Sequence, residues 1–469
     1  MATLSAAPGG LDWCFDAEVL RRHDRAGPRY TSYPTAPHFH EGCGGDTLLQ
    51  ALRRSNASGR SLSLYVHVPF CSSPCFYCGC NRVITRDRSR GMAYVTRVLA
   101  EADLLAAQLD PSREVVQLHL GGGTPNFLTA QAMQALLEGL RQRFTFSGSP
   151  ARDFSIELDP RFIDRGDVAM LAALGFNRAS LGVQDFDPRV QAAINREQGM
   201  EQTLDVLRAC REHGMRSVNV DLIYGLPEQS LEGFGRTLEQ VLALRPDRLA
   251  VYGYAHLPHM FRAQRQIDPL RLPQPEQKLA LLGLAVQRLS TAGYQYIGMD
   301  HFALPEEDLS RAQRAGQLHR NFMGYTTHAD TDLVGMGVSA ISSIGQTYSQ
   351  NPRDLPAWEA RLDAGQLPTW RGVVLDSDDA LRAQVIQQLM CHGSVDLQAL
   401  CAPLGLDYQV YFADALQALR TLCADGLARR RGAQVSASAA GRPLLRLLAM
   451  CFDRYLPQPA QTPNFSRAI

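Results

Sequence analysis

Six short apolar segments recur between residues 61 and 255, separated by stretches whose apolar positions have the spacing of helices. The short segments are rich in β-branched and aromatic residues, which is typical of buried parallel strands. Thr129 precedes one helical stretch as a candidate N-cap, and Gly214 ends another. This alternation predicts a parallel α/β unit. Its expected strands are SLSLYVHVPF, VVQLHLGGG, DFSIELDP, RASLGVQDF, SVNVDLIYG and RLAVYGYA.

Polar residues and glycines gather where these expected strands end. In barrel-type α/β folds the loops after the strands converge on one mouth, which carries the active site. Six repeats predict an open, incomplete (β/α)6 barrel, and a doubly wound sheet is an alternative that strand patterns alone leave open. The expected mouth comprises the Cys71 loop, Gly121 to Thr124, Glu157 with Asp159, Gln184 with Asp185, Asp221, and Ala255 with His256.

The chain divides into three expected parts. Residues 1–60 lack strong periodicity and contain the aromatic, proline-punctuated stretch GPRYTSYPTAPHF, so we expect an N-terminal extension that wraps over another surface. Residues 61–370 form the expected barrel and its extension, and residues 371–469 form a mostly helical C-terminal domain with a tail. Within that domain, GLARRRGAQVSASAAGRPLL is typical of a short hairpin, which gives the domain a winged-helix-like pattern.

Composition and charge narrow the class of function. Lys plus Arg and Asp plus Glu both total 47, so nothing global favours nucleic acid or an acidic membrane as a partner. No stretch approaches the ~20 apolar residues of a spanning helix, and the N-terminus lacks a signal-peptide pattern, so we expect a cytoplasmic protein. Lys278 is the only lysine and is expected on a helix surface, which argues against a Walker-type phosphate site and a Schiff-base enzyme.

Four cysteines lie within ten residues in CSSPCFYCGC, which runs from Cys71 to Cys80. Cys71, Cys75 and Cys78 follow a strand with the spacing Cys-x-x-x-Cys-x-x-Cys. Three thiolates on a short loop can hold three corners of an iron-sulfur cube and leave the fourth iron open. Structural zinc is the alternative, although it usually takes two separated Cys or His pairs, and the sequence has no visible second pair.

The motifs around this triplet resemble those of a known family. YVHVPFCSSPCFYCGCN is similar to the cluster segment of the oxygen-independent coproporphyrinogen III oxidases, which belong to the radical S-adenosylmethionine (SAM) superfamily. The resemblance runs from about Gly27 to Ile469, and among the matched positions only Tyr77 varies, where Phe is also seen. The other matching motifs are LGGGTPNF, SIELDP, LGVQDF, INREQ, NVDLIYGLP, GMDHFA, LHRNFMGYTT and the terminal NFSRAI.

The resemblance implies a radical SAM barrel, two cofactors and a reaction. It assigns a 4Fe-4S cluster to the cysteine triplet, with SAM bound at the open iron. The implied reaction is oxidative decarboxylation of two propionate side chains of coproporphyrinogen III to vinyl groups, which gives protoporphyrinogen IX in heme biosynthesis. An electron donor and an electron acceptor are the implied partners, and we expect a monomer. Arg29, Arg320 and Arg467 lie in matching segments, but the sequence leaves open which arginines hold the substrate carboxylates.

The resemblance also assigns residues to the SAM site. The glycines of GGGTP would let backbone carbonyls reach the ammonium group of SAM, and Arg196 would pair with its carboxylate. Tyr65 and His67 alternate out of the first strand onto the same face, where His67 is a candidate for proton handling, with a satisfied structural histidine as the alternative. Together with Tyr65, the implied SAM residues are Tyr77, Gly122, Gly123, Thr124, Glu157, Gln184, Arg196, Asp221, Ile223, Ala255 and Ile341.

Cys80 is the residue that separates the alternatives. A fourth cysteine ligand would close the cluster to SAM, so Cys80 is expected beside the site, among the catalytic residues with Tyr65 and His67, and not on iron. A heme-binding chaperone related to the enzyme is one alternative, which by resemblance lacks this cysteine and the RYTSYPTAPHF segment. A ferredoxin-like electron carrier is another, but it would need four cluster cysteines and no ligand-binding barrel.

Overall fold

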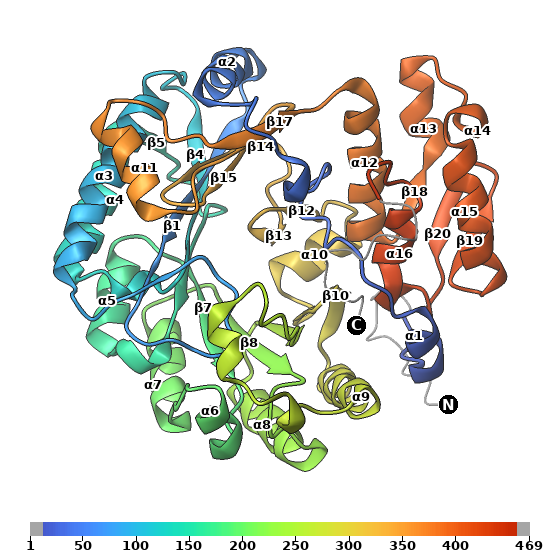
Figure 1. Cartoon of the computed structure of the whole chain (residues 1–469), viewed down its shortest axis with the longest axis horizontal. Coiled ribbons are helices and arrows are strands. Elements are labelled where there is room, and N and C mark those ends of the chain that lie inside the picture. Colours follow the sequence, from blue (N-terminus) through green and yellow to red (C-terminus); the bar gives the residue numbers. More distant parts are fainter. Residues whose placement is uncertain (1–12, 457–469) are drawn as a thin grey trace.

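The computed structural model describes residues 13–456, and its largest part is a barrel-like sheet covered by helices (Figure 1). Thr129 caps α4 through its side chain, and Gly214 follows α7 with a φ of 76°, as predicted. The six predicted strands are β1 (Ser61–Val68), β4 (Glu114–Gly122), β6 (Asp153–Leu158), β7 (Arg178–Gln184), β8 (Ser217–Tyr224) and β9 (Arg248–Gly253). The covering helices are α3 (Ser89–Ala106), α4 (Ala130–Arg143), α5 (Arg165–Ala173), α6 (Pro188–Ala193), α7 (Met200–Glu212), α8 (Leu231–Leu244) and α9 (Pro275–Thr291).

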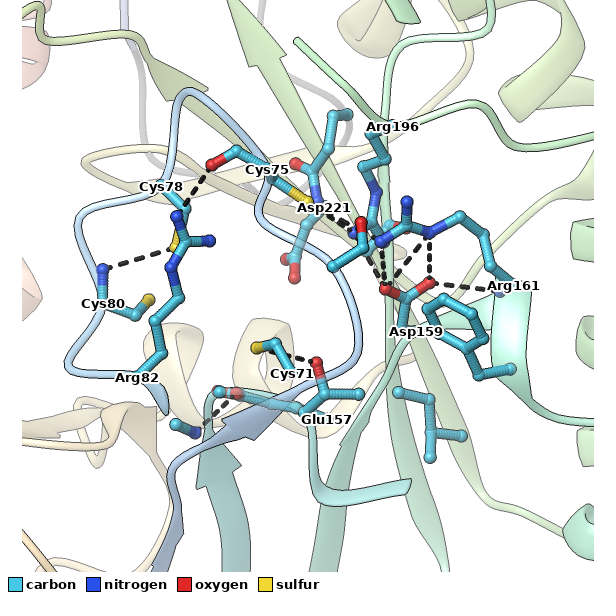
Figure 2. Close-up of a pocket in the computed structure, with 18 of the residues that line it drawn as sticks. Cys71, Cys75, Cys78, Cys80, Arg82, Glu157, Asp159, Arg161, Arg196 and Asp221 are labelled. Carbon is cyan, nitrogen blue, oxygen red and sulfur yellow. Dashed lines mark hydrogen bonds and ion pairs between the residues drawn. The ribbon is translucent and has the colours of Figure 1, made fainter. Parts of the chain in front are cut away.

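The order of the strands decides between the two expected architectures. β1, β4, β6, β7, β8 and β9 lie side by side in chain order, and every neighbouring pair is parallel. A doubly wound sheet would reverse its direction of growth at a switch point within this series. The barrel alternative is therefore confirmed, and the Cys71 loop lies at the carboxyl ends of its strands (Figure 2).

The barrel does not close on itself. The free edge of β1 pairs in parallel with β14 (Thr331–Met336), and β9 pairs with the antiparallel β11 (His301–Ala303). The strand pattern of residues 61–255 had not revealed this seventh parallel strand. The sheet continues from these edges through β10 (Gln295–Gly298) on one side, and through β15 (Ile341–Ile344), β16 (Thr347–Gln350) and β17 (Arg371–Val374) on the other.

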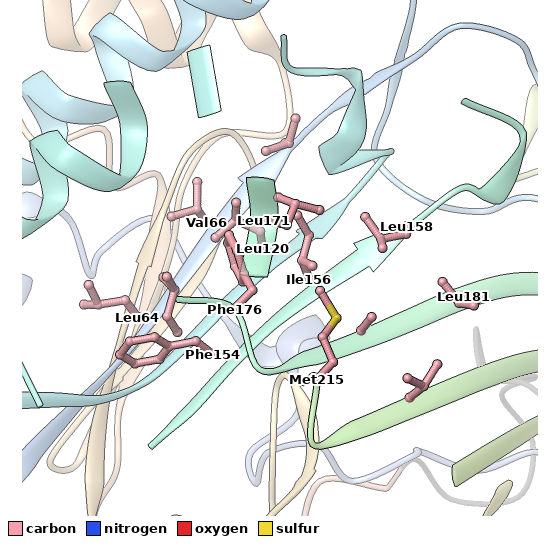
Figure 3. Packing of buried hydrophobic residues seen from close by; sticks show 14 of the residues in the cluster. Leu64, Val66, Leu120, Phe154, Ile156, Leu158, Leu171, Phe176, Leu181 and Met215 are labelled. Atoms are coloured by element: carbon pink, nitrogen blue, oxygen red, sulfur yellow. The ribbon is translucent and has the colours of Figure 1, made fainter. Parts of the chain in front are cut away.

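Side chains of the barrel strands alternate between an apolar outer face and a polar interior. Leu64 and Val66 of β1 join the main core beneath the helices, together with Leu120 and Ile156 from the neighbouring strands (Figure 3). The intervening positions carry Ser63, Tyr65, His67, Gln117, His119, Ser155, Glu157, Ser180, Asn219 and Asp221. A closed eight-stranded barrel fills its interior with layers of apolar side chains. The polar side chains inside this open barrel can instead contact a polar ligand.

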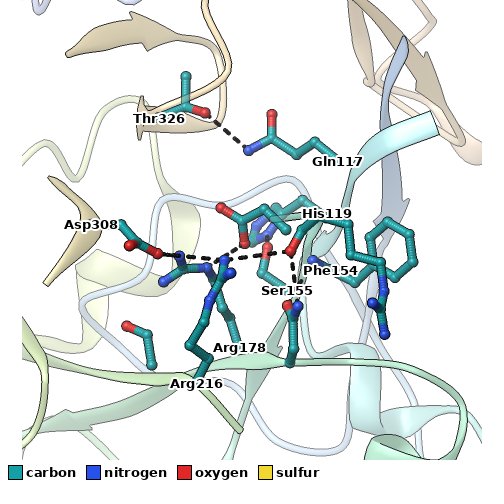
Figure 4. A network of polar contacts seen from close by, with 12 residues as sticks. Gln117, His119, Phe154, Ser155, Arg178, Arg216, Asp308 and Thr326 are labelled. Atoms are coloured by element: carbon teal, nitrogen blue, oxygen red, sulfur yellow. Dashed lines mark hydrogen bonds and ion pairs between the residues drawn. The ribbon is translucent and has the colours of Figure 1, made fainter. Parts of the chain in front are cut away.

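Buried ion pairs link several elements at the end of the barrel opposite the mouth (Figure 4). Arg178, at the start of β7, is 5% exposed and forms ion pairs with Asp153 at 2.6 Å and with Glu307 at 3.1 Å. Its guanidinium also pairs with Asp308, the first residue of α10 (Asp308–Arg314). Arg248 gives Glu307 a second cationic partner. The network joins three strands to one helix at this end of the barrel.

The C-terminal part has a core of its own. The succession of one helix, one strand, further helices and a hairpin is the predicted winged-helix-like pattern. The last strand of the large sheet, β17, extends to Val374, so we propose the boundary after that strand and not at residue 370. The elements are α12 (Ser377–His392), β18 (Ser394–Asp396), α13 (Leu397–Cys401), α14 (Tyr408–Tyr411), α15 (Ala413–Ala424), β19 (Ala428–Arg431), β20 (Gln434–Ala437) and α16 (Leu445–Met450).

The N-terminal extension connects the two parts. It contains α1 (Ala17–His23) and α2 (Gly45–Ser55), and Leu20, Tyr30 and Tyr33 are buried in the C-terminal core.

The expectation of a solvated Lys278 was wrong, because its side chain is half-buried and donates to the carbonyl of Tyr254 at 3.1 Å. No helix within residues 13–456 is both long and apolar enough to cross a membrane.

Candidate active site

The loop that carries the four cysteines crosses the mouth of the barrel. It leaves β1 through β2 (Phe70–Cys71) and returns through β3 (Val83–Ile84), which pairs with β2. On its outward course, the N–H of Phe76 donates to the carbonyl of Ile194 at 2.9 Å, and Asn195 donates to the carbonyl of Pro74 at 2.7 Å. These contacts pin the loop to the segment after α6, so that its thiols face the barrel (Figure 2).

The thiols line a cavity of about 310 Å³, which we call the mouth cavity. This volume is at the lower end of the range for small-molecule sites, roughly 300–1,000 Å³. The side chains at the ends of β6, β7 and β8 all reach it, which the rule for barrel folds predicts. The predicted site residues brought together here are Cys71, Cys75, Tyr77, Cys78, Cys80, Gly122, Gly123, Thr124, Glu157, Gln184, Arg196, Asp221 and Ile223.

A second cavity of about 200 Å³, the inner cavity, contains Tyr65, His67 and Ile341. Glu157 lines both cavities and therefore marks their junction. Ala255 is the one predicted site residue that lines neither. Its carbonyl accepts a hydrogen bond from Gln264 at 3.2 Å, and the same amide donates to the carbonyl of Tyr77, so Ala255 supports the loop from behind.

Arg196 is the main cationic group of the mouth cavity. Its Nη1 lies 3.0 Å from Asp159 and 3.5 Å from the sulfur of Cys75, and its Nη2 donates to the carbonyl of Gly182 at 2.7 Å. The Nε group is buried without a hydrogen-bond partner in the described chain. One unused N–H on a fixed, buried guanidinium suits an anionic ligand, because a buried unpaired donor is costly.

Two carboxylates line the barrel side of the same cavity. Burial alone would raise the pKa of Glu157, but hydrogen bonds from His119 and from the backbone N–H of Gly122 bring it below its ordinary value. Burial, followed by the nearby charge of Glu157, raises the pKa of Asp221 to about 6. Asp221 is held by Asn219 at 2.7 Å and by Ser180 at 3.1 Å. The pair can accept hydrogen bonds from ammonium or hydroxyl groups of a ligand.

Tyr65 and His67 form one hydrogen-bonded unit. The His67 Nε2 lies 2.9 Å from the carbonyl of Asn81, which can only accept, so this nitrogen carries the proton. The Nδ1 then accepts from the Tyr65 hydroxyl at 3.0 Å. Burial lowers the pKa of His67. Both ring nitrogens are already hydrogen-bonded within the chain. The geometry therefore favours a neutral imidazole that orients Tyr65, and gives less support to a role of His67 in proton handling.

The glycines of GGGTP serve packing inside the chain. A Cβ on Gly122 would lie 2.6 Å from the ring of His67, and Gly122 has a φ of 116°. A Cβ on Gly123 would lie 2.5 Å from the carbonyl oxygen of Pro69. The missing side chains therefore let β4 pass directly under the start of the cysteine loop, in addition to any ligand contact.

The donor set suits a cluster better than a single ion. Within residues 13–456, no three Cys, His, Asp or Glu side chains are grouped to hold one metal ion. Three thiols that line one cavity without converging on a point match ligands of three different irons. The backbone N–H of Cys80 donates to the sulfur of Cys78 at 3.4 Å, and hydrogen bonds of this kind tune the thiolates of iron-sulfur clusters.

Sequence reasoning missed several supporting residues. Asp159 was noted only as a polar strand end, but it binds both Arg196 and Arg161. His119, which holds Glu157, was not selected. The period of two along β4 could have found it, since positions 117, 119 and 121 share the inner face. Tyr252 in the mouth cavity had no comparable signal.

Comparisons with known proteins agree with this geometry. The model of the radical SAM superfamily matches residues 65–241. The oxygen-independent coproporphyrinogen III oxidase of Pseudomonas aeruginosa is 49% identical over 455 residues, covering 97% of this chain and 99% of that protein. The protein of the same name from Escherichia coli is 46% identical, covering 98% and 99%. The solved structure of coproporphyrinogen III oxidase (HemN) from Escherichia coli, described as a radical SAM enzyme, has a TM-score of 0.90 at 44% identity, covering 95% of this chain and 100% of that chain.

An open barrel with a cysteine-rich loop at its mouth and a superfamily match over residues 65–241 defines a radical SAM enzyme. Such enzymes use a 4Fe-4S cluster and SAM. The near full-length matches are more specific, and the chain belongs to the family of oxygen-independent coproporphyrinogen III oxidases. The resemblance found in the motifs is thereby confirmed. The terminal motif NFSRAI lies outside the described residues.

Arg196→Ala should weaken SAM binding and leave the cluster in place. Loss of a charge-assisted pair costs roughly 1.5–3 kcal/mol, so we expect the Kd for SAM to rise by about 10- to 150-fold. Asp159 keeps its ion pair with Arg161 at 2.7 Å, which protects the loop from collapse. Equilibrium dialysis with labelled SAM, alongside iron and sulfide analysis, measures both effects. The control is Arg189→Ala on the exposed face of α6. Loss of iron with normal SAM affinity would contradict the assignment.

Proposed function

We propose that this chain converts coproporphyrinogen III to protoporphyrinogen IX without oxygen, by oxidative decarboxylation of two propionate side chains to vinyl groups. The observation that carries the proposal is the mouth cavity, where the cysteine triplet lies beside the partly unsatisfied Arg196. Membership of the oxidase family across nearly the whole chain supports the choice of substrate. A second function is not favoured by any particular contact in the described residues.

The residues present fit the two cofactors. Cys71, Cys75 and Cys78 would hold the 4Fe-4S cluster, and Cys80 would remain free beside it. Reductive cleavage of SAM at such a cluster supplies the radical that starts the reaction. Arg196 would bind the carboxylate of SAM through its unused Nε, and the strand-end carboxylates would accept hydrogen bonds from its amino and hydroxyl groups.

The protein's own part is to bind, orient and exclude water. Glu157 lines both the mouth cavity and the inner cavity, so a group bound in one lies next to a group bound in the other. The Tyr65 hydroxyl, directed by His67, presents a fixed polar group in the inner cavity. We propose that the inner cavity receives the propionate that reacts, with Ile341 as its apolar wall.

Partners and setting follow from the same features. The reaction removes electrons from the substrate and consumes a reductant at the cluster, so we propose an external electron donor and a separate acceptor. One chain supplies every site residue named above, which supports action as a monomer. None of the eleven cysteines, which all lie within the described residues, forms a disulfide, which supports a reducing compartment such as the cytoplasm.

The test is an anaerobic incubation of the cluster-loaded enzyme with coproporphyrinogen III, SAM and a chemical reductant, followed by product analysis. We expect protoporphyrinogen IX, with methionine and 5'-deoxyadenosine formed in step. A matched incubation without SAM is the control. Tight binding of heme with no decarboxylation would contradict the proposal and favour the related chaperone.

A further inference from the structure

Arg320 is a buried cation whose charge the described chain does not balance. It lies on β12 (His319–Asn321), which forms a hairpin with β13 (Gly324–Thr326) between the barrel and the C-terminal part (Figure 1). Only 5% of the residue is exposed, and its Nε and Nη1 groups have no hydrogen-bond partner. No carboxylate within residues 13–456 forms an ion pair with it. A desolvated guanidinium is strongly unfavourable without a counter-charge, so the position calls for an anion.

The hairpin holds this cation in one place. Arg320 stands opposite Tyr325, and its guanidinium lies 4.7 Å from the centre of the Tyr325 ring. The Tyr325 hydroxyl donates to the carbonyl of Met390 at 3.2 Å, and Gln387 is hydrogen-bonded to His319 at 2.8 Å. Helix α12 thus anchors both strands. A ligand that binds here need not order the arginine first, which strengthens binding.

Arg320 lines a cavity of about 190 Å³, which we call the arm cavity because residues 30–33 of the N-terminal extension form one wall. Phe322 and Tyr348 also line it, with ring centroids 5.5 Å apart. Phe322 lines the inner cavity as well, together with Tyr65 and Glu157. The arm cavity with its unbalanced cation therefore lies next to the inner cavity, and Phe322 lines both. Aromatic walls suit the flat apolar body of a macrocycle.

We propose that Arg320 binds a carboxylate of coproporphyrinogen III on a propionate other than the one reacting in the inner cavity. The inference rests on the proposed function. A substrate with four carboxylates can place one propionate in the inner cavity and another in the arm cavity, with its ring system against Phe322. The planar guanidinium fork matches a carboxylate. Arg29 is a weaker candidate because it is already paired with Asp300, and Arg467 lies outside the described residues.

The test separates charge recognition from macrocycle packing. Coproporphyrin III, the oxidised macrocycle that does not react, and its tetramethyl ester, whose carboxyl groups are uncharged, are titrated into the cluster-loaded enzyme under dilute detergent. In Arg320→Met, we expect affinity for the free acid to fall by about 10-fold or more, with affinity for the ester unchanged. Iron content and SAM affinity should stay as in the wild type. The control is Arg429→Met, on the exposed hairpin of the C-terminal part.

An unchanged preference for the free acid in Arg320→Met, or an equal loss of both ligands, would overturn the assignment. If that variant fails to fold, Arg320→Lys decides. It keeps the charge without the fork, so we expect weaker binding of the acid and a retained preference over the ester, whereas wild-type affinity for the acid would overturn the proposal. If the wild type neither binds coproporphyrin III nor converts coproporphyrinogen III, the proposed function itself fails, which is a different result from a selective failure at Arg320.

Discussion

Cys78→Ala, purified without oxygen, is expected to lose its intact cluster and all SAM-dependent turnover, whereas Cys80→Ala should retain about four irons per chain. In the proposed site, Cys71, Cys75 and Cys78 bind three irons, and a fourth thiolate would occupy the position that SAM needs. Cys80 contacts Cys78 in two ways: its backbone N–H lies 3.4 Å from the Cys78 sulfur, and its thiol also hydrogen-bonds that sulfur. Alanine removes the thiol contact but keeps the backbone N–H, so part of the support of Cys78 survives in the Cys80 variant.

Iron and sulfide analysis, with electron paramagnetic resonance of the reduced cluster, measures the contrast between the two variants. In Cys80→Ala, addition of SAM should still perturb the signal of the reduced cluster. The Cys210→Ala variant, at a buried thiol of α7 far from the loop in sequence, controls for the loss of a cysteine as such. If Cys80→Ala loses its cluster as readily as Cys78→Ala, the open iron is wrong, and the radical mechanism is wrong with it.

Arg178→Ala should lower the free energy of unfolding by about 3–5 kcal/mol, because breaking a buried ion network strands the remaining charges. Arg178 and Asp153 are at most 9% exposed in their side chains, and Asp153 has no other ion pair within the described residues. Glu307 keeps Arg248 at 2.6 Å, so the stranded charge is mainly that of Asp153. The loss of stability should therefore arise mainly where β6 and β7 begin, at Asp153 and Arg178.

Chemical denaturation followed by circular dichroism measures this loss, with Arg165→Ala as the control. Arg165 forms ion pairs with Asp205 and Glu212 on the exposed surface, where solvent screens them, so its removal should leave the unfolding midpoint unchanged. An unfolding midpoint for Arg178→Ala equal to that of the control would mean that the ion-pair network around Arg178 does not stabilise the fold.

The strands of the barrel and the polar residues at their ends could be predicted from the sequence. Each strand is a short apolar segment, and its last residues turn polar where the loops converge, so Glu157, Gln184 and Asp221 were recognisable one at a time. Their meeting in one cavity follows from parallel strands in chain order. The cysteine loop could also be predicted, because its cysteines lie within ten residues of one another.

Contacts between distant segments could not be predicted. The pairing of β1 with β14 joins positions about 270 residues apart, since Ser61 faces Thr331, and the short segment TDLVGM has no feature that names its partner. The partnership of Arg196 with Asp159 is similar, because either residue alone is typical of a surface ion pair. The unpaired Nε and Nη1 groups of Arg320 could not be predicted either, because only the folded structure shows which groups surround them.

The most direct test of the central claim uses coproporphyrinogen III with deuterium on the carbons of its propionate side chains. The enzyme is incubated anaerobically with SAM and a reductant, and the 5'-deoxyadenosine is analysed by mass spectrometry. We predict that deuterium moves from the propionate carbon into 5'-deoxyadenosine as protoporphyrinogen IX forms. Formation of protoporphyrinogen IX with unlabelled 5'-deoxyadenosine, or only in the presence of oxygen, would contradict a radical SAM decarboxylation by this chain.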